Sequence, residues 1–186
     1  MRIIGGKFKG KNIKYLKNTI TRPLKDSIKE NIFNILTHSN LINTAIEGAN
    51  ILDVYSGVGS FGLECISRGA KKVTFVERDK NALLVLEQNL STLSIKKQSQ
   101  IIKNKIEDMS FENNKQKYDI CFLDPPFADN IFIQNFRLIK RNKIYKNNHI
   151  IIIHREINSN DNFDDWFRSI IIKKYGRSKI IFGRFS

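Results

Sequence analysis

The chain has 186 residues, and its 32 Lys or Arg against 18 Asp or Glu give a formal net charge of +14 at pH 7. This length suits one domain over 1–186, and the basic balance favours an anionic partner, nucleic acid ahead of an acidic membrane surface. No apolar run approaches a membrane span, and residues 1–6 lack the apolar core of a signal peptide. We therefore expect a cytoplasmic protein without a membrane contact.

Residues 1–20 are basic and contain three glycines at positions 5, 6 and 10. Apolar residues between these glycines predict short strands joined by glycine turns, that is, a small β-hairpin extension ahead of a core at 21–186. Lysines interleaved with such strands suit a phosphate backbone. A solvated edge hairpin is an equally good interpretation of this stretch alone.

The next part of the chain predicts an α/β fold. Pro23 breaks the chain, and Ile28, Ile32 and Ile35 then recur at helical spacing, which predicts a helix at 26–36. Beyond it, strands alternating with helices predict a parallel sheet covered on both faces. Strands are expected at 51–55, 72–77, 99–103, 118–124, 149–154, 171–175 and 178–182, with helices at 61–68, 79–90, 131–139 and 163–170.

The stretch from Asp53 to Gly62 predicts a ligand site. It reads as an apolar strand, a Ser-Gly turn and a helix, the context in which G-x-G-x-x-G becomes meaningful. Gly57 and Gly59 can take positive φ and let a ligand approach the backbone, and the helix start behind them offers unpaired N–H groups. The glycine pattern alone also occurs in ordinary turns.

Two acids near this turn indicate the ligand. Glu77 follows the second strand, about 20 residues beyond the turn, where a carboxylate can accept both hydroxyls of a ribose. A surface ion pair with Arg78 or Lys80 is the alternative. Asp53 is unfavourable beside a pyrophosphate and favours a ligand that carries an amino group and a sulfonium.

The Asp124-Pro125-Pro126-Phe127 tetrapeptide at the end of the fourth strand is the most specific motif in the chain. Asp124 and the Pro125 carbonyl can both accept hydrogen bonds from one exocyclic NH2 group, and Phe127 offers a flat face for a base. This combination predicts methyl transfer to a base amine through alignment and electrostatics, without a covalent intermediate.

Together these motifs resemble the bacterial 16S rRNA guanine-N2 methyltransferases of the RsmD type, over almost the whole chain. The resemblance rests on residues 2–6, 9–11, 21–23, 33–36, 53–64, 67–70, 76–79, 124–127, 175–176 and 179–180.

The resemblance implies a class I S-adenosylmethionine-dependent methyltransferase (Rossmann-like) fold with an antiparallel C-terminal hairpin. It also implies that the methyl acceptor is the 2-amino group of a guanine in 16S rRNA, on the small ribosomal subunit or its assembly intermediate. Separately, we expect a monomer. Lys105 stands where the family has an acid that recognises adenine, so either Glu107 or Asp108, or backbone groups near Ile106, are expected to take that role. The expected S-adenosylmethionine contacts are Asp53, Ser56, Gly57, Gly59, Glu77, Arg78 and Ile106; the expected catalytic residues are Asp124, Pro125, Pro126 and Phe127; and the expected RNA contacts are Arg2, Lys7, Lys9, Lys11 and Arg22.

Two other functions remain open. A DNA adenine-N6 methyltransferase also uses this type of Asp-Pro-Pro motif but needs extra sequence for target recognition. A basic RNA-binding or assembly protein on an inactive methyltransferase scaffold would account for Lys105 and the charge.

The scattered His149 and His154 are read as flanking a buried strand and predict no metal site. Cys65 and Cys121 are expected to be buried thiols, and Trp166 a packing residue.

Overall fold

The computed structural model describes residues 1–16, 24–106, 116–126, 129 and 131–186. Its α-helices are α1 Asp26–His38, α2 Ser60–Ser67, α3 Lys80–Thr92 and α4 Phe132–Arg141, and the 3-10 helices are η1 Gly6–Phe8, η2 Lys96–Gln98 and η4 Asp164–Trp166. The strands are β1 Asn50–Val54, β2 Lys72–Val76, β3 Ser99–Ile102, β4 Tyr118–Leu123, β5 Tyr145–Glu156, β6 Phe167–Tyr175 and β7 Ser178–Phe185.

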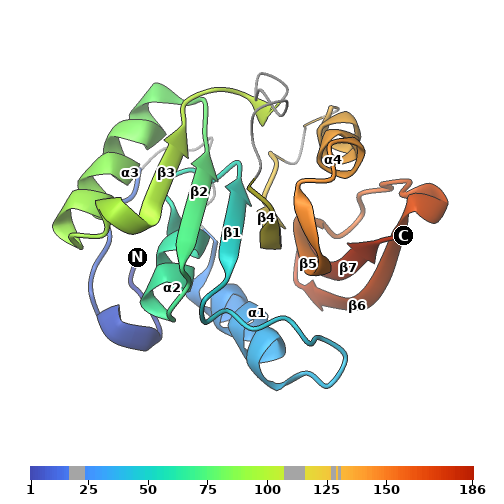
Figure 1. Ribbon diagram of the computed structural model, residues 1–186, viewed down its shortest axis with the longest axis horizontal. Helices are drawn as coiled ribbons and strands as arrows, with labels where there is room; N and C mark the ends of the chain where they lie inside the picture. The colour runs from blue at the N-terminus through green and yellow to red at the C-terminus, as the bar shows by residue number, and fades with distance from the viewer. Residues whose placement is uncertain (17–23, 107–115, 127–128, 130) are drawn as a thin grey trace.

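The described strands form one seven-stranded sheet in the order β3-β2-β1-β4-β5-β7-β6 (Figure 1). The first five in this order pair in parallel, whereas β7 runs antiparallel to both β5 and β6. The predicted mixed sheet with a C-terminal hairpin is therefore confirmed. Because β1 leads to β2 and β3 on one side while β4 leads to β5 on the other, β1 and β4 flank the switch point, where sheets of this kind bind ligands.

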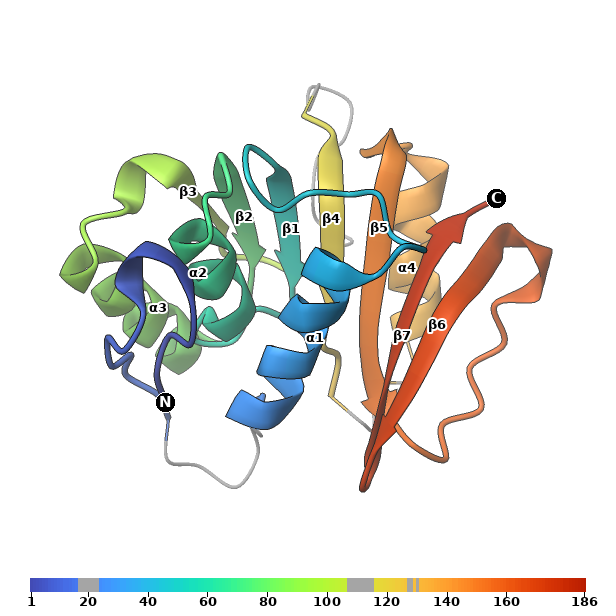
Figure 2. The same ribbon diagram turned by 90° about the horizontal axis from the view of Figure 1, so that it is seen from below.

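Helices cover both faces of the sheet. In Figure 2, α1 and α2 lie in front of the strands and α4 lies behind them. Side chains of α1, α2 and α3 share one apolar cluster with alternate strand residues such as Ile150 and Ile152. Ile151 and Ile153 of the same strand belong to a second cluster with α4. Central strands buried on both faces explain the continuous apolar runs in the sequence.

The helix predicted at 163–170 is wrong. Phe163, Trp166, Phe167 and Ile170 have helical spacing, but only the short η4 forms, and β6 begins at Phe167. β6 pairs with β7 along its length, and the aromatic side chains pack on Phe136 of α4. Tertiary pairing thus overrides the local period. Trp166 is a packing residue, as predicted.

The N-terminal extension differs from the predicted hairpin of strands. Its two limbs meet in a single antiparallel bridge between Arg2 and Asn12, and η1 occupies the turn. Further main-chain hydrogen bonds, including Ile3 N–H to Lys11 O at 3.0 Å, hold the limbs together. No regular strand is assigned within 1–16. Regular pairing ends early because side chains of α1 and α2 bind the main chain of one limb.

Candidate active site

The glycine turn connects β1 to α2 at the carboxyl end of the sheet. Gly57 and Gly59 have φ of 54° and 88°, so both adopt the predicted left-handed conformation. A Cβ on Gly59 would lie 2.6 Å from Leu86 Cδ1 of α3, whereas a Cβ on Gly57 would meet nothing within 4 Å. Gly59 is therefore required by the packing of α3, and the open side of the turn is at Gly57.

Glu77 reaches this turn from the end of β2. Its Oε2 accepts a hydrogen bond from Gly57 N–H at 2.7 Å. Its Oε1 accepts from the N–H groups of Arg78 and Asp79, both at 2.8 Å. These main-chain contacts hold the carboxylate against the turn, so the structure places Glu77 beside Gly57.

Asp53 lies beneath the turn and is 1% exposed. Its Oδ2 accepts a hydrogen bond from Gly62 N–H in α2 at 2.9 Å. Burial raises the pKa of Asp53 well above its ordinary value; the Gly62 hydrogen bond opposes this rise, and the nearby carboxylates of Asp124 and Glu77 add to it. Three acids from three strands thus lie close enough to interact at one edge of the sheet.

Asp124 is brought beside the turn by strand register. Val54 of β1 pairs with Leu123 of β4, and Asp124 N–H donates to Val54 O at 3.3 Å. Pro125 is buried and Pro126 is exposed. Phe127 lies outside the described residues. The Asp-Pro-Pro corner therefore adjoins the glycine turn at the switch point, as the predicted mechanism requires.

Asp124 has a side-chain partner that the sequence analysis did not predict. His154 Nδ1 lies 2.8 Å from Asp124 Oδ1, and the side chains are 11% and 24% exposed. His154 lies inside β5 rather than at its end, because β5 is twice as long as predicted and also contains His149.

The remaining predicted cofactor residues occupy different environments. Ser56 Oγ is buried, and within the described residues it has no hydrogen-bond partner. Arg78 is exposed, with its N–H bonded to Glu77. Ile106, which follows β3, is 2% exposed and packs in the apolar cluster that contains Val54 and Val76.

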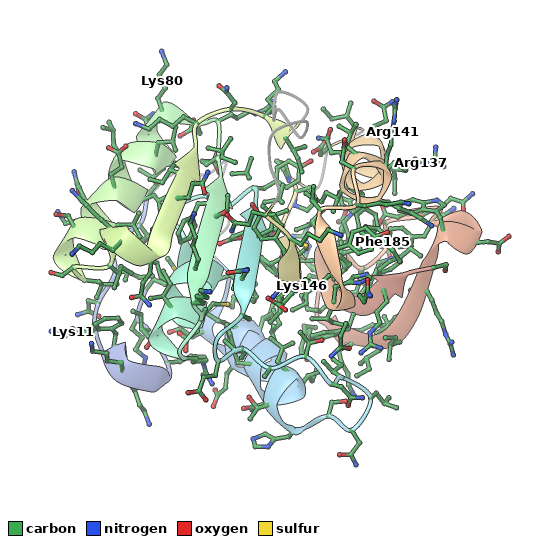
Figure 3. All side chains as sticks on the ribbon, viewed as in Figure 1. Lys11, Lys80, Arg137, Arg141, Lys146 and Phe185 are labelled. Carbon is green, nitrogen blue, oxygen red and sulfur yellow. The ribbon has the colours of Figure 1, made fainter. Side chains whose placement is uncertain are left out.

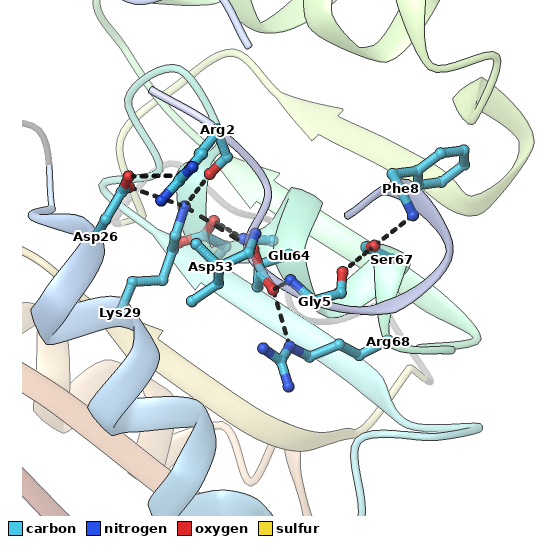
Figure 4. Close-up of polar contacts among 11 residues, drawn as sticks. Arg2, Gly5, Phe8, Asp26, Lys29, Asp53, Glu64, Ser67 and Arg68 are labelled. Carbon is cyan, nitrogen blue, oxygen red and sulfur yellow. Dashed lines mark hydrogen bonds and ion pairs between the residues drawn. The ribbon is translucent and has the colours of Figure 1, made fainter. Parts of the chain in front are cut away.

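The N-terminal segment is held by a buried polar cluster (Figure 4). Glu64 of α2 accepts hydrogen bonds from the N–H groups of Ile4 at 2.8 Å and Gly5 at 2.7 Å, and from Arg68 Nε at 2.9 Å. Lys29 of α1 is fully buried; its Nζ donates to Arg2 O at 2.7 Å and lies 3.9 Å from Glu64 Oε2. Burial lowers the pKa of Lys29, and the charge of Glu64 opposes this shift.

The predicted RNA-binding cations are carried on the outside of this segment. Arg2 is 66% exposed at its side chain and lies 3.7 Å from Asp26. Lys7, Lys9 and Lys11 are also exposed, and Figure 3 shows Lys11 at the outer edge of the molecule. Arg22 lies outside the described residues.

Asn89 of α3 connects the segment to the glycine turn. It is 2% exposed, its Oδ1 accepts from Lys14 N–H at 2.8 Å, and its Nδ2 donates to Val58 O and Lys14 O, both at 3.1 Å. One amide side chain thus joins the basic segment, α3 and the turn that faces the candidate site.

Comparison with known proteins identifies the family. A family model described as conserved hypothetical protein 95 matches residues 1–184. Ribosomal RNA small subunit methyltransferase D of Haemophilus influenzae is 35% identical over 158 residues, 84% of this chain and 79% of that protein. The chain belongs to the ribosomal RNA small subunit methyltransferase D family.

Solved structures agree with this family and its fold. The Escherichia coli protein yhhF is 27% identical, with a TM-score of 0.83 over 100% of this chain and 97% of that one. The protein SMU.776, solved complexed with SAH, is 16% identical, with a TM-score of 0.58 over 80% of this chain and 48% of that one. The latter likeness shows the fold alone, the class I methyltransferase fold expected from the sequence.

The polar groups at the glycine turn fit S-adenosylmethionine. Gly57 leaves one side of the turn open, Ser56 Oγ is a buried hydroxyl without a partner in the described chain, and Glu77 places a carboxylate at the same turn. An ionised carboxylate accepts hydrogen bonds, which suits ribose hydroxyls. These residues fit the cofactor.

Other features of the molecule lie away from this site. A hollow of about 550 Å³ lies at the amino ends of β1, β4 and β5, lined by residues such as Ala49, Lys117 and Lys146. In the ranges described, no set of three or more His, Cys, Asp or Glu side chains could hold a metal ion. None of the described helices has the length and apolar character needed to cross a membrane. Cys65 and Cys121 are buried free thiols, as predicted.

Proposed function

We propose that this protein transfers a methyl group from S-adenosylmethionine to the exocyclic 2-amino group of a guanine in 16S rRNA, on the small ribosomal subunit or its assembly intermediate. The observation that carries the proposal is the position of Asp124 beside the glycine turn, at the switch point of the sheet. The name of the Haemophilus influenzae relative supports an rRNA substrate. The proposal implies a cytoplasmic, monomeric protein.

In this proposal one set of residues binds S-adenosylmethionine and another set binds the acceptor base. When bound, S-adenosylmethionine supplies a methyl carbon on a positively charged sulfur. Glu77 and the open side of Gly57 would hold the ribose and methionine parts, and Asp53 and the neighbouring acids would favour the positive charge. Ser56 and Arg78 would contact the same ligand, and backbone groups near Ile106 would contact adenine.

Asp124 would hold the acceptor amine. The guanine 2-amino group is a weak nucleophile because its lone pair is delocalised into the ring. Two acceptors, the Asp124 carboxylate and the Pro125 carbonyl, can hold its two hydrogens and favour a pyramidal nitrogen. S-adenosylmethionine would supply the methyl carbon to this nitrogen, its sulfur would keep the electrons of the broken carbon–sulfur bond, and the amine would lose one proton to water. Pro126 stiffens this corner, and Phe127 is proposed to stack on the base.

Methyl transfer to small ribosomal subunits tests the catalytic part. Subunits from cells lacking the protein receive radiolabel, and the labelled nucleoside is identified as N2-methylguanosine. Asp124→Ala should abolish transfer and leave S-adenosylmethionine affinity by calorimetry within about tenfold. Asp119→Asn on the same strand, which keeps an acceptor for Asn50 N–H, is the matched control and should turn over normally. Wild-type turnover by Asp124→Ala refutes the assignment, and label in duplex DNA supports the adenine-N6 alternative.

Salt dependence tests the RNA contacts, for which Arg2, Lys7, Lys9, Lys11 and Arg22 are proposed. Changing Lys7 and Lys9 together to Ala should weaken RNA binding and flatten the slope of log affinity against log salt by about 1.4, at roughly 0.7 per lost phosphate contact. The same double change at Lys173 and Lys174, exposed on the edge strand β6, removes equal charge elsewhere. Equal slopes for the two double variants would contradict a role for the N-terminal segment.

A further inference from the structure

His154 and Asp124 are cross-strand neighbours by register. β4 and β5 run parallel, and Leu123 pairs with Ile153 at the end of their ladder. The following residues on the two strands are therefore Asp124 and His154, which share one face of the sheet. The resulting 2.8 Å contact joins His154 inside β5 to Asp124, the first residue after β4, so its geometry is set by the paired ends of two buried strands.

The chemistry of the contact determines its direction. An ionised carboxylate has no hydrogen to donate, so the hydrogen in this pair is carried by Nδ1 of His154 and is donated to Oδ1 of Asp124. In the part of the chain that the structure describes, this is the carboxylate's one side-chain hydrogen bond. Oδ2 of Asp124 is then the oxygen left to accept from a substrate amine.

Without such a partner Asp124 could turn away from the site, because its side chain is 24% exposed. It also lies at the edge of the sheet where Asp53 and Glu77 gather further acidic groups. A hydrogen bond from a side chain that is 11% exposed opposes that rotation.

We propose that His154 is a positioning residue for methyl transfer, which fixes the rotamer of Asp124 so that Oδ2 faces the acceptor amine. This inference rests on the proposed function and deepens it. A misplacement of about 1 Å at a reacting group costs about 100-fold in rate. Loss of the His154 hydrogen bond should therefore lower kcat by about 10- to 100-fold and leave the affinity for S-adenosylmethionine unchanged.

Three substitutions separate positioning from simple packing. His154→Leu removes the donor while keeping an apolar side chain. His154→Asn places an amide N–H close to where Nδ1 lies, whereas His154→Gln places one farther out, near Nε2. The expected kcat on small ribosomal subunits is within about fivefold of wild type for the Asn variant and about 10- to 100-fold lower for the Leu and Gln variants. In an Asp124→Asn background, His154→Leu should add less than a threefold loss.

Some results would overturn the proposal. These are wild-type kcat in the folded Leu variant, equal losses in the Asn and Gln variants, or a parallel loss of cofactor affinity by calorimetry. If His154→Leu does not fold, the difference in kcat between His154→Asn and His154→Gln still tests the proposal.

A measurement without turnover separates this inference from the proposed function. Nitrogen-15 NMR of labelled imidazole in the free protein should show His154 with its hydrogen on Nδ1, and Asp124→Ala should release that preference. A hydrogen on Nε2 in wild type refutes the inference alone. Absence of methyl transfer by wild type refutes the proposed function alone.

Discussion

Replacing Glu64 by Gln should destabilise the protein by about 3–5 kcal/mol, the range for breaking a buried ion pair. The two carboxylate oxygens accept from the N–H groups of Ile4 and Gly5 and from Arg68 Nε, and they face Lys29. Gln has one oxygen, so either orientation of its amide sets an NH2 group against a donor. Lys29 also loses its buried countercharge. For a chain of this length the loss corresponds to roughly 6–20 °C in Tm.

Urea unfolding and amide exchange measure this effect. The free energy of unfolding gives the magnitude, and faster exchange of the two amides that Glu64 accepts from gives the location. Glu87→Gln is the matched control, because its ion pair with Lys103 is exposed and should be worth at most about 1 kcal/mol. Adding Lys29→Met to Glu64→Gln should cost less than the sum of the two single changes, since no buried charge is then left alone. A loss below about 1 kcal/mol, or strict additivity, would refute the reasoning.

Three further changes test other parts of the structure. Gly59→Ala should destabilise by about 1–3 kcal/mol more than Gly10→Ala in urea unfolding, because both have positive φ but only Gly59 would meet Leu86. Burial raises the pKa of Asp53, so its contribution to folding stability is most favourable below pH 3.8 and is lost as pH rises through the pKa of the folded protein. Asp53→Asn should therefore become more stable relative to wild type as pH rises. Parallel plots of unfolding free energy against pH for the two proteins would contradict this. Burial lowers the pKa of His149 below 6.5, so the folded protein should lose stability as pH drops below 6.5. When Tm is measured against pH, His149→Asn should show a smaller decrease over this range than wild type.

Helices and strands whose apolar residues recur at a regular spacing could be predicted from the sequence. The helix at 26–36 and the strands at 51–55 and 72–77 match α1, β1 and β2 to within a few residues. Asp79 also accepts a hydrogen bond from Ala82 N–H and so caps α3, the helix predicted at 79–90. In these segments the local preference and the tertiary environment agree, so the pattern suffices.

The failures occur where distant segments decide the local structure. The stretch 163–170, which includes the start of β6, reads as a helix by spacing, yet β7 pairs with β6 and α4 packs against its aromatic side chains. The N-terminal limb reads as a strand, yet Glu64 and Ser67 of α2 take up its main-chain groups. The deciding contacts join residues that are well separated in sequence, such as Phe167 with Phe185 and Ile4 with Glu64, so the local pattern could not reveal them.

In the candidate site, too, some residues could be predicted from the sequence and others could not. Spacing alone identified the glycine turn, Glu77 and the Asp124 corner, because each is a short motif tied to the end of a strand. His154 was assigned to a strand end without a role, and Asn89, Lys29 and Glu64 were not singled out. A buried lysine or glutamate has no signature in a sequence that is rich in exposed ones.

The order of residues by itself determined the alternation of strands and helices, the basic N-terminal segment and the motifs at strand ends, since these depend on neighbours a few positions away. Only the tertiary structure decided which side chains meet. The register of β4 with β5 sets His154 against Asp124, and the packing of α1 on α2 sets Lys29 against Glu64. Contacts of this kind depend on how distant segments share a core, and that information is spread over the whole chain rather than held in any one stretch.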